Sequence, residues 1–189
     1  MMEIKTFGVI GAGQMGNGIA QVAAMSGLDV VMNDIKTEFV ERGLATITKI
    51  LARSVDKGKI TADKKDAILD RIKPSTDLQD MSKADFVVEA ATENEGLKFQ
   101  IFNNLDEICQ SGVILATNTS SIPIGRIAAQ TRRPELVIGM HFMNPVPVMK
   151  LVEVIPGIAT SDETFKTTWD LSEKFGKTPA KANDYPGFI

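Results

Sequence analysis

Short runs of apolar residues recur along the chain, and each is followed by a turn or by a segment with helical spacing of its apolar positions. Runs that are apolar at nearly every position are typical of parallel strands covered by helices on both faces. Their alternation with helical segments predicts an α/β protein with a Rossmann-type, doubly wound and mostly parallel sheet. The predicted strands are TFGVI, DVVMN, ADFVVEAA, VILATN and ELVIGMHF.

Three segments between or after these runs have the features of helices. Residues 16–27 end at a glycine, which commonly follows the last helical residue. Residues 162–176 carry Asp162 as a capping residue and also end at a glycine. Residues 97–109 place apolar side chains at helical spacing, which predicts one buried face. These side chains are Phe99, Phe102, Leu105 and Cys109.

The connection between Asp34 and the strand near Phe86 is longer than a single crossover helix requires. It has two helical patterns, joined at the sequence DKGKIT of residues 56–61. We therefore expect a helical hairpin that projects from the sheet.

Composition and charge narrow the class of protein. Hydrophobic residues make up 43% of the chain and charged residues 24%, which is the balance of a globular protein. The net charge of −3 does not predict a nucleic-acid partner or an anionic membrane surface. No apolar run approaches membrane-spanning length, so no membrane partner is expected.

The single cysteine and the two ends of the chain give further expectations. Cys109 has no partner for an internal disulfide, which agrees with a reducing compartment, and we expect it to be a half-buried apolar residue rather than a nucleophile. The first strand begins almost at once and leaves no room for a leader peptide, so we expect a cytoplasmic protein. Residues 1–189 are predicted to form one domain, and the final PGFI suggests that a further element follows.

Three glycines have the spacing of a dinucleotide-binding turn. Gly11, Gly13 and Gly16 follow the first strand and open a helix, in the pattern G-x-G-x-x-G. Such glycines allow a tight turn, a close approach of pyrophosphate and close packing of helix on strand. The helix N-terminus also favours an anion. The alternative is a tight turn that binds nothing, because the motif alone is a weak signal.

Asp34 ends the next strand, where a carboxylate can accept hydrogen bonds from the ribose of adenosine. A carboxylate at this point repels a 2′-phosphate, and no arginine follows it closely, although Lys36 is near. The sequence therefore predicts NAD rather than NADP as the cofactor. Asp34 as a simple turn residue remains the alternative.

The only histidine of the chain lies in the segment HFMNPVPVMKLVEV. The turn in this segment is too short for a parallel crossover, so the two flanking strands should form an antiparallel hairpin. If the hairpin is symmetric about Pro147, His141 lies opposite Glu153 on the same face. A carboxylate beside the ring favours the imidazolium and leaves the other nitrogen to exchange a proton, which is acid–base chemistry. A structural histidine is the alternative.

Polar residues at a neighbouring strand end favour an oxidoreductase. Asn118, Ser120 and Ser121 end the segment VILATNTSS and should share a sheet edge with His141 and the glycine turn. His141 would then remove the proton of an alcohol as hydride leaves its carbon for NAD, with Ser120 bonded to the same oxygen. Either Ser120 or Ser121 could instead only cap a helix that begins near Ile124. A Ser-His-Glu hydrolase is disfavoured because there is no G-x-S-x-G elbow.

Five motifs together resemble the NAD-binding domain of 3-hydroxyacyl-CoA dehydrogenases, most closely the bacterial 3-hydroxybutyryl-CoA dehydrogenases. They are GAGQMG, VVEAATEN, NTSS, HFMNPVPVMKLVEV and DYPGFI, and they occur in the same order as in the family. The resemblance covers essentially the whole chain. It implies interconversion of an (S)-3-hydroxyacyl-CoA and the 3-ketoacyl-CoA.

The resemblance also implies roles for individual residues. His141 matches the catalytic base, Glu153 its carboxylate partner, Ser120 the serine on the substrate oxygen and Asn144 an asparagine of the substrate pocket. From the residues alone, Lys98 is interpreted as a solvated lysine and Glu93 as an acid at a helix start, whereas the resemblance places both near the nicotinamide. The cofactor positions are then Gly11, Gly13, Gln14, Met15, Gly16, Asp34, Glu93, Lys98 and Asn118.

Basic residues line one face of the first hairpin helix. Lys49, Arg53 and Lys57 are four residues apart, opposite a face formed by Leu44, Ile47 and Leu51. A solvated charged face is the ordinary interpretation. The resemblance implies instead that Lys49 and Arg53 hold the coenzyme A nucleotide.

Two departures from the family pattern matter. Met143 stands where the family usually has a second phenylalanine, which should be a mild change. A catalytic asparagine and a helical dimerisation domain are expected after PGFI, and both are missing here, so the complete enzyme is expected to be a homodimer. The alternatives are an NAD-binding module without activity, a dehydrogenase of free β-hydroxy acids, and a structural protein like a related lens crystallin.

Overall fold

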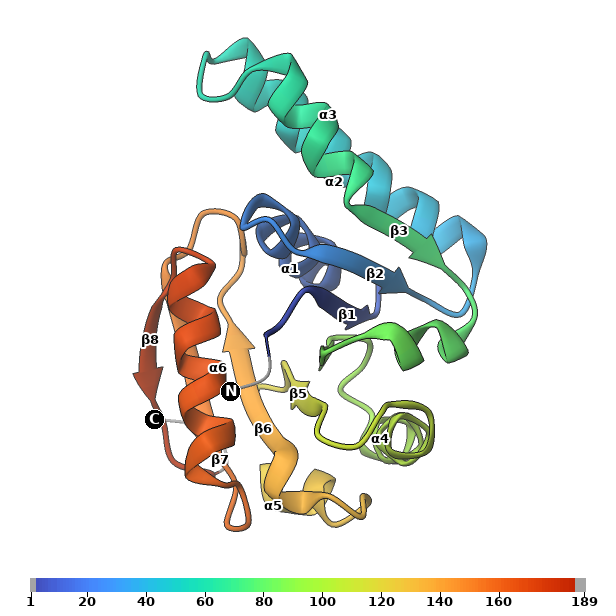
Figure 1. Cartoon of the computed structure of the whole chain (residues 1–189), viewed down its shortest axis with the longest axis vertical. Coiled ribbons are helices and arrows are strands. Elements are labelled where there is room, and N and C mark those ends of the chain that lie inside the picture. The colour runs from blue at the N-terminus through green and yellow to red at the C-terminus, as the bar shows by residue number, and fades with distance from the viewer. Residues whose placement is uncertain (1–2, 186–189) are drawn as a thin grey trace.

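The computed structural model describes residues 3–185, so the PGFI part of the last motif lies outside the described residues. In this part of the chain, eight strands form one sheet in the order β3-β2-β1-β4-β5-β6-β7-β8 (Figure 1). The strands are β1 (Thr6–Ile10), β2 (Asp29–Asn33), β3 (Ile72–Ser75), β4 (Phe86–Glu89), β5 (Ile114–Thr117), β6 (Val137–Phe142), β7 (Leu151–Pro156) and β8 (Thr178–Lys181).

The helices confirm the predicted alternation of strands and helices. They are α1 (Gln14–Met25), α2 (Thr37–Asp56), α3 (Ala62–Asp70), α4 (Glu95–Ile108), α5 (Ile124–Ala128) and α6 (Asp162–Lys174), with 3₁₀ turns η1 (Leu78–Lys83) and η2 (Pro134–Leu136). The Rossmann-type prediction is therefore correct, including the projecting hairpin of α2 and α3 (Figure 1).

Strand directions explain how the site residues reach one edge. The strands from β3 to β6 in sheet order pair in parallel, so their carboxyl ends meet at the same edge of the sheet. The pair β6 and β7 is antiparallel, with His141 opposite Glu153, and β8 then runs parallel to β7. The expected hairpin and its register are confirmed.

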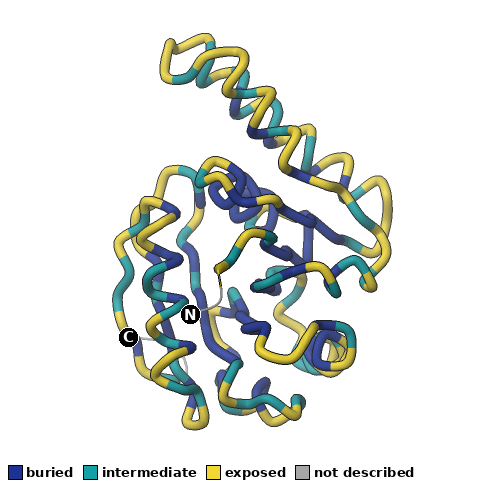
Figure 2. Tube along the Cα trace, in the orientation of Figure 1, coloured by how far each residue is buried: buried dark blue, intermediate teal, exposed yellow. Residues whose placement is uncertain are grey.

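Each face of the sheet has its own hydrophobic core. One core lies under α1, α2 and α6, where the Phe7 ring stacks on Phe86 at 5.5 Å and meets Phe175 edge-on at 5.3 Å. The other core lies under α4 and α5 and includes Phe102, Leu105 and Leu115. Figure 2 shows the central strands buried and the outer end of the helical hairpin exposed. The sheet is thus a rigid platform for its loops.

The two strands that were predicted neither from the apolar pattern nor from the hairpin turn are the edge strands β3 and β8. Each is four residues long and largely exposed, and each contains a proline, Pro74 or Pro179. A proline on an exposed edge limits further strand pairing. Edge strands of this kind have no continuous apolar run and therefore give no signal in the sequence.

Three helix ends differ from the predictions. The side chain of Ser161, not Asp162, caps α6 by accepting a hydrogen bond from the Thr164 amide. Neither Ser120 nor Ser121 caps α5, because the Asp184 carboxylate accepts hydrogen bonds from the first two amides of that helix, at 2.7 and 2.9 Å. Lys57 follows the last residue of α2, so it is not on that helix.

A buried carboxylate joins α4 to the loop before η2. Asp106 is 5% exposed and accepts hydrogen bonds from the Arg132 amide and guanidinium and from the Arg133 guanidinium. Burial acts to raise the pKa of Asp106, but these hydrogen bonds outweigh it and hold the pKa below its ordinary value of 3.8.

We predict that Asp106→Asn lowers the free energy of unfolding at pH 7 by about 3 kcal/mol, because Arg133 is left without its charged partner. The carboxylate stabilises the fold fully above pH 3.8, and this contribution is lost as the pH falls through the lowered folded-state pKa. Urea unfolding at several pH values should therefore show a difference between wild type and variant that shrinks in acid. A difference that is constant with pH would contradict this account.

Candidate active site

The glycine motif forms the turn from β1 into α1. Gly11 has a φ of 97°, and a Cβ there would lie 2.7 Å from the Ala90 carbonyl oxygen. A Cβ on Gly16 would collide with the Gly11 carbonyl oxygen, so this glycine allows the close packing of helix on strand. A Cβ on Gly13 would meet nothing within 4 Å. The turn therefore has open space at the position where a dinucleotide pyrophosphate needs it.

Asp34 lies beside this turn at the end of β2. One carboxylate oxygen accepts a hydrogen bond from the Ala12 amide at 2.7 Å, and the other accepts from the Ile35 amide at 2.7 Å. Both bonds hold the side chain in place, and a carboxylate has further lone pairs for ribose hydroxyls. The structure therefore brings Asp34 to the glycine turn, as the sequence predicted.

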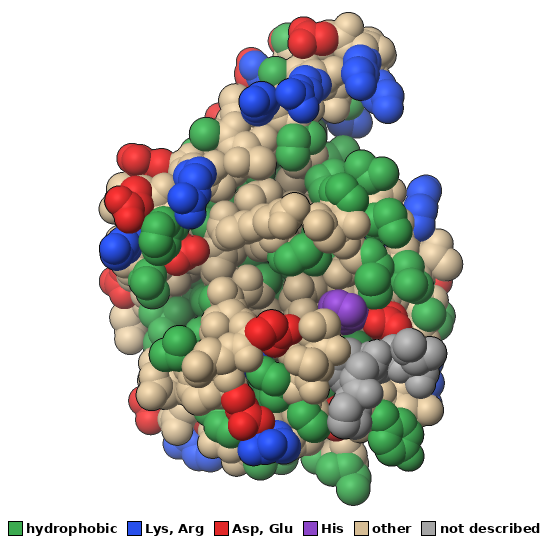
Figure 3. All heavy atoms as spheres, turned by 180° about the vertical axis from the view of Figure 1, so that it is seen from behind, with side chains coloured by type: hydrophobic (Ala, Val, Ile, Leu, Met, Phe, Trp, Pro, Cys, Tyr) green, Lys and Arg blue, Asp and Glu red, His purple; other side chains and the backbone are tan. Residues whose placement is uncertain are grey.

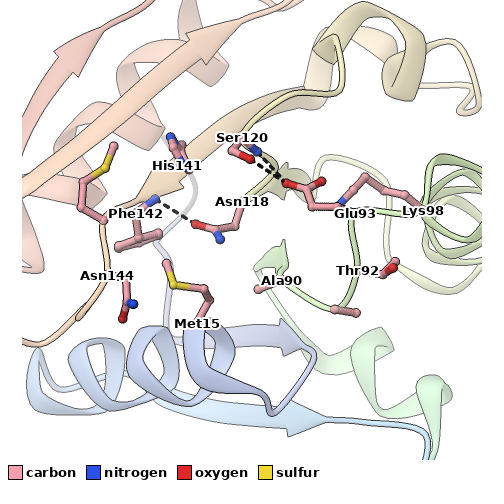
Figure 4. A pocket seen from close by; sticks show the side chains of 12 residues that line it. Met15, Ala90, Thr92, Glu93, Lys98, Asn118, Ser120, His141, Phe142 and Asn144 are labelled. Carbon is pink, nitrogen blue, oxygen red and sulfur yellow. Dashed lines mark hydrogen bonds between the residues drawn. The ribbon is translucent and has the colours of Figure 1, made fainter. Parts of the chain in front are cut away.

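A cavity of about 390 Å³ opens at the carboxyl edge of β4, β5 and β6 (Figure 4). Seven of the predicted site residues line it, from α1, from the loop after β4, from α4, from the end of β5 and from the end of β6 and the loop after it. The lining residues are Met15, Ala90, Ala91, Thr92, Glu93, Lys98, Asn118, Ser120, His141, Phe142, Met143 and Asn144.

The histidine and its carboxylate partner form a direct pair. The His141 Nδ1 atom lies 2.7 Å from the Glu153 Oε2 atom, and the two side chains are 19% and 16% exposed. Burial of this degree limits competition from water, so the bond orients the ring. In the space-filling view the histidine reaches the surface of a hollowed face (Figure 3). The arrangement suits proton transfer at the ring.

Glu93 binds the end of β5 on the other side of the cavity. Its carboxylate accepts hydrogen bonds from the Ser120 amide at 2.7 Å and the Ser120 hydroxyl at 3.1 Å (Figure 4). It also accepts a hydrogen bond from the Thr119 hydroxyl at 2.8 Å. The Asn118 side-chain oxygen accepts from the Phe142 amide at 2.8 Å, which ties β5 to β6. The predicted polar strand end is thus held in one conformation.

Lys98 is not the solvated lysine that its helical position suggested. It is 1% exposed, and its ammonium group donates hydrogen bonds to Glu89 and to Thr117, which are both 0% exposed. Glu89 and Thr117 are not among the predicted site residues. The available signal was a charged residue inside the apolar strand FVVE, because a buried strand rarely contains an unpaired carboxylate.

The basic face of α2 lies next to a second cavity, of about 410 Å³. Gly13, Gln14 and Asn144 line this cavity, and α2 contributes Thr46 and Ile50. Lys49 and Arg53 are exposed on α2, beside Ile50 and one turn beyond it. Neither of these two basic residues is among those that line the two cavities, and the basic residue of α2 that lines the second cavity is Arg42.

Three further features bear on the chemistry. Cys109 is 5% exposed, and burial raises the pKa of its thiol to about 11, which agrees with a packing role. Within residues 3–185, no cluster of three or more His, Cys, Asp or Glu side chains has the arrangement of a metal site. None of the helices described is long and apolar enough to cross a membrane.

Comparison with known proteins identifies the family. Residues 6–185 match the family model described as 3-hydroxyacyl-CoA dehydrogenase, NAD binding domain. This chain belongs to the 3-hydroxyacyl-CoA dehydrogenase family. The prediction of an NAD-binding, oxidoreductase-family domain from the five motifs is therefore confirmed.

Relatives in this dehydrogenase family agree closely in sequence and fold. A probable 3-hydroxybutyryl-CoA dehydrogenase of Deinococcus radiodurans is 55% identical over 97% of this chain, and one of Bacillus subtilis is 54% identical over 100%. The crystal structure of (S)-3-hydroxybutyryl-CoA dehydrogenase from Ralstonia eutropha matches with a TM-score of 0.97 at 49% identity and covers 99% of this chain. In each case the chain spans 66% of the relative's length.

Two glycine substitutions separate cofactor binding from folding. Gly13→Ala should keep the stability of the dehydrogenase domain within about 1 kcal/mol, because the added methyl group meets no protein atom. It should weaken NADH binding at least about tenfold, since the methyl group fills the approach of the pyrophosphate. NADH fluorescence titration and thermal unfolding measure the two effects.

The matched control is Gly16→Ala, which should destabilise the fold itself through its collision with the Gly11 carbonyl. NADH affinity at the wild-type level in Gly13→Ala would show that the cofactor does not approach over this turn.

Proposed function

We propose that the protein is an NAD-dependent oxidoreductase that interconverts an (S)-3-hydroxyacyl-CoA and the 3-ketoacyl-CoA, with 3-hydroxybutyryl-CoA as its substrate. The observation that carries the proposal is the His141–Glu153 pair, which lies at the same sheet edge as the glycine turn. An acid–base pair and a dinucleotide turn at one edge suit the oxidation of an alcohol. The names of the close relatives support this substrate class.

In this mechanism His141 is the general base. Its ring takes the hydroxyl proton of the substrate, and Glu153 stabilises the imidazolium that forms. NAD, when bound, accepts the hydride from the carbon that carries this hydroxyl. Asn144 contacts the substrate from the wall shared by the two cavities.

Ser120 has to change its hydrogen bond during the reaction. A hydroxyl has a single proton, and the Ser120 hydroxyl donates it to Glu93. When the ketone forms, its oxygen needs a donor, so the proton of Ser120 turns from Glu93 to the substrate. Glu93 keeps its bonds to the Ser120 amide and the Thr119 hydroxyl during this rotation.

The cofactor would lie along the sheet edge from the glycine turn to the cavity. Asp34 binds the adenosine ribose, and the turn and the first residues of α1 bind the pyrophosphate. Glu93 and Lys98, which line the cavity of Figure 4, would hold the nicotinamide there. The residues of this path are Gly11, Gly13, Gln14, Met15, Gly16, Asp34, Glu93, Lys98 and Asn118.

The coenzyme A nucleotide of the substrate would bind at the helical hairpin. Lys and Arg side chains gather on this hairpin in the space-filling view (Figure 3). Lys49 and Arg53 are exposed there, on the same helix as Thr46 and Ile50, which line the cavity that reaches Asn144. Guanidinium and ammonium groups on this helix can bind the phosphates while the acyl group reaches His141.

The domain organisation of the complete enzyme is part of this proposal. Residues 1–189 act as the dinucleotide-binding domain, and the remaining third of the relatives' length supplies a helical domain that dimerises and closes the cleft. The chain alone should therefore turn over slowly. A second candidate is a module that binds NAD without turnover, since the glycine turn and Asp34 by themselves form a dinucleotide site.

The test follows NADH absorbance after the protein is mixed with acetoacetyl-CoA, for wild type and for His141→Ala. We expect NADH consumption by the wild type and a rate lower by about 10² to 10⁴ in the variant, with NADH affinity unchanged, because general-base catalysis contributes this much. Turnover within a few-fold of wild type in the variant would remove the imidazole from the mechanism. NADH binding without any wild-type turnover would favour the module.

Arg53→Ala tests the substrate class. If the coenzyme A phosphates bind at the hairpin, the apparent affinity for acetoacetyl-CoA should fall roughly tenfold, since one charge-assisted hydrogen bond is lost. Steady-state kinetics measure this, with free acetoacetate as the control substrate. An unchanged affinity for the acyl-CoA would favour a dehydrogenase of free β-hydroxy acids.

A further inference from the structure

A buried group of polar residues lies directly behind the wall of the catalytic cavity. Glu89, at the end of β4, accepts hydrogen bonds from Lys98 and from the Thr117 hydroxyl with one carboxylate oxygen. Its other oxygen accepts from the amides of Ala91 and Thr92, at 2.9 and 3.4 Å. Four donors therefore converge on one carboxylate that is 0% exposed.

The same group connects to the cavity on two sides. The loop that starts at Ala91 carries Glu93, whose carboxylate holds Ser120. Lys98 lines the cavity, and Figure 4 shows its side chain reaching from α4 toward Glu93. Among the described residues the ammonium group has two acceptors, Glu89 and Thr117, so one of its three donors is left for a molecule in the cavity.

Stability alone does not account for this pair. An ion pair buried away from water contributes little or nothing more to the free energy of folding than apolar residues of similar volume. A buried ion pair is therefore weak evidence for a stabilising role. Most of the surrounding strand positions are apolar, including Val87, Val88, Leu115 and Ala116. A neutral pair would therefore pack at the same place without loss.

We propose that Glu89 is a positioning residue for the cofactor: it holds the buried Lys98 ammonium at the cavity wall and shapes the loop that carries Glu93. The inference rests on the proposed function, because it takes the cavity as the nicotinamide site. The ligand chemistry that the remaining Lys98 donor suits is a neutral carbonyl or hydroxyl oxygen of the nicotinamide nucleoside. A phosphate is excluded because its charge would meet the Glu93 carboxylate, which lines the same cavity, and the Glu89 carboxylate behind its wall.

The test is the double variant Glu89→Gln, Lys98→Met. It removes both charges together, and the side-chain oxygen that remains at position 89 still faces the amides of Ala91 and Thr92. We expect thermal unfolding at or above the wild-type temperature, since no buried charge is left unpaired. We also expect the dissociation constant for NADH, measured by fluorescence titration, to rise about tenfold to a hundredfold, because a hydrogen bond from a charged donor is lost.

A matched control is the pair Asp106→Asn, Arg133→Met, which removes another buried ion pair, away from the residues that line the cavity. Its NADH affinity should equal that of the wild type. If the Glu89 and Lys98 double variant is stable and binds NADH as tightly as wild type, the pair is only structural and the inference is wrong.

A different result would contradict the proposed function rather than the inference. If wild-type protein itself does not bind NADH, the proposed cofactor site fails, whatever the variants do. A double variant that unfolds at a clearly lower temperature would show that the charges stabilise the fold, and this would also overturn the inference. Glu89→Gln alone, which keeps Lys98, provides a second readout: if Glu89 positions the ammonium group, NADH affinity should fall in this variant as well, and wild-type affinity there would overturn the inference.

Discussion

The antiparallel pairing of β6 with β7 is the constraint on which the reactive edge depends. The strands up to β6 are parallel, so their carboxyl ends lie at one edge of the sheet. Each of these strand ends contributes only its own side chains to that edge. A hairpin at this point returns the chain at once and places Glu153 directly beside His141. Two residues that are far from the glycine turn in sequence therefore become part of its edge. Without this reversal the imidazole would have no carboxylate on the neighbouring strand.

The surrounding structure keeps this edge rigid. The Phe7 ring packs against rings from β4 and from the residue that follows α6, so the centre of the sheet has little freedom. Asn118 ties the end of β5 to β6, and Glu93 holds Ser120 on the opposite side of the cavity. Catalysis by positioned groups needs such fixed geometry, because small displacements of a base or a donor reduce the rate.

Much of this organisation follows from local rules and was predictable. The parallel strands are continuous apolar runs, the glycine spacing specifies the turn, and the short loop around Pro147 requires a hairpin whose register pairs His141 with Glu153. The cofactor and the family were predictable because several motifs occur in one order. The predicted roles of Lys49, Arg53 and Asn144 toward the substrate remain predictions.

The features that escaped prediction depend on tertiary contacts. Burial of Lys98 is not visible from its place on a helix, since Glu89 and Thr117 come from two different strands. The cap on α5 comes from Asp184, which is distant in sequence, so a local serine looked like the better candidate. The edge strands β3 and β8 pair through their backbones and have no apolar run.

The most direct test of the central claim is a crystal structure of the protein with NADH and acetoacetyl-CoA. The account predicts the nicotinamide in the cavity beside Glu93, with the keto oxygen of the substrate within hydrogen-bonding distance of both the His141 ring and the Ser120 hydroxyl. A nicotinamide bound elsewhere, or a keto oxygen that His141 cannot reach, would contradict it.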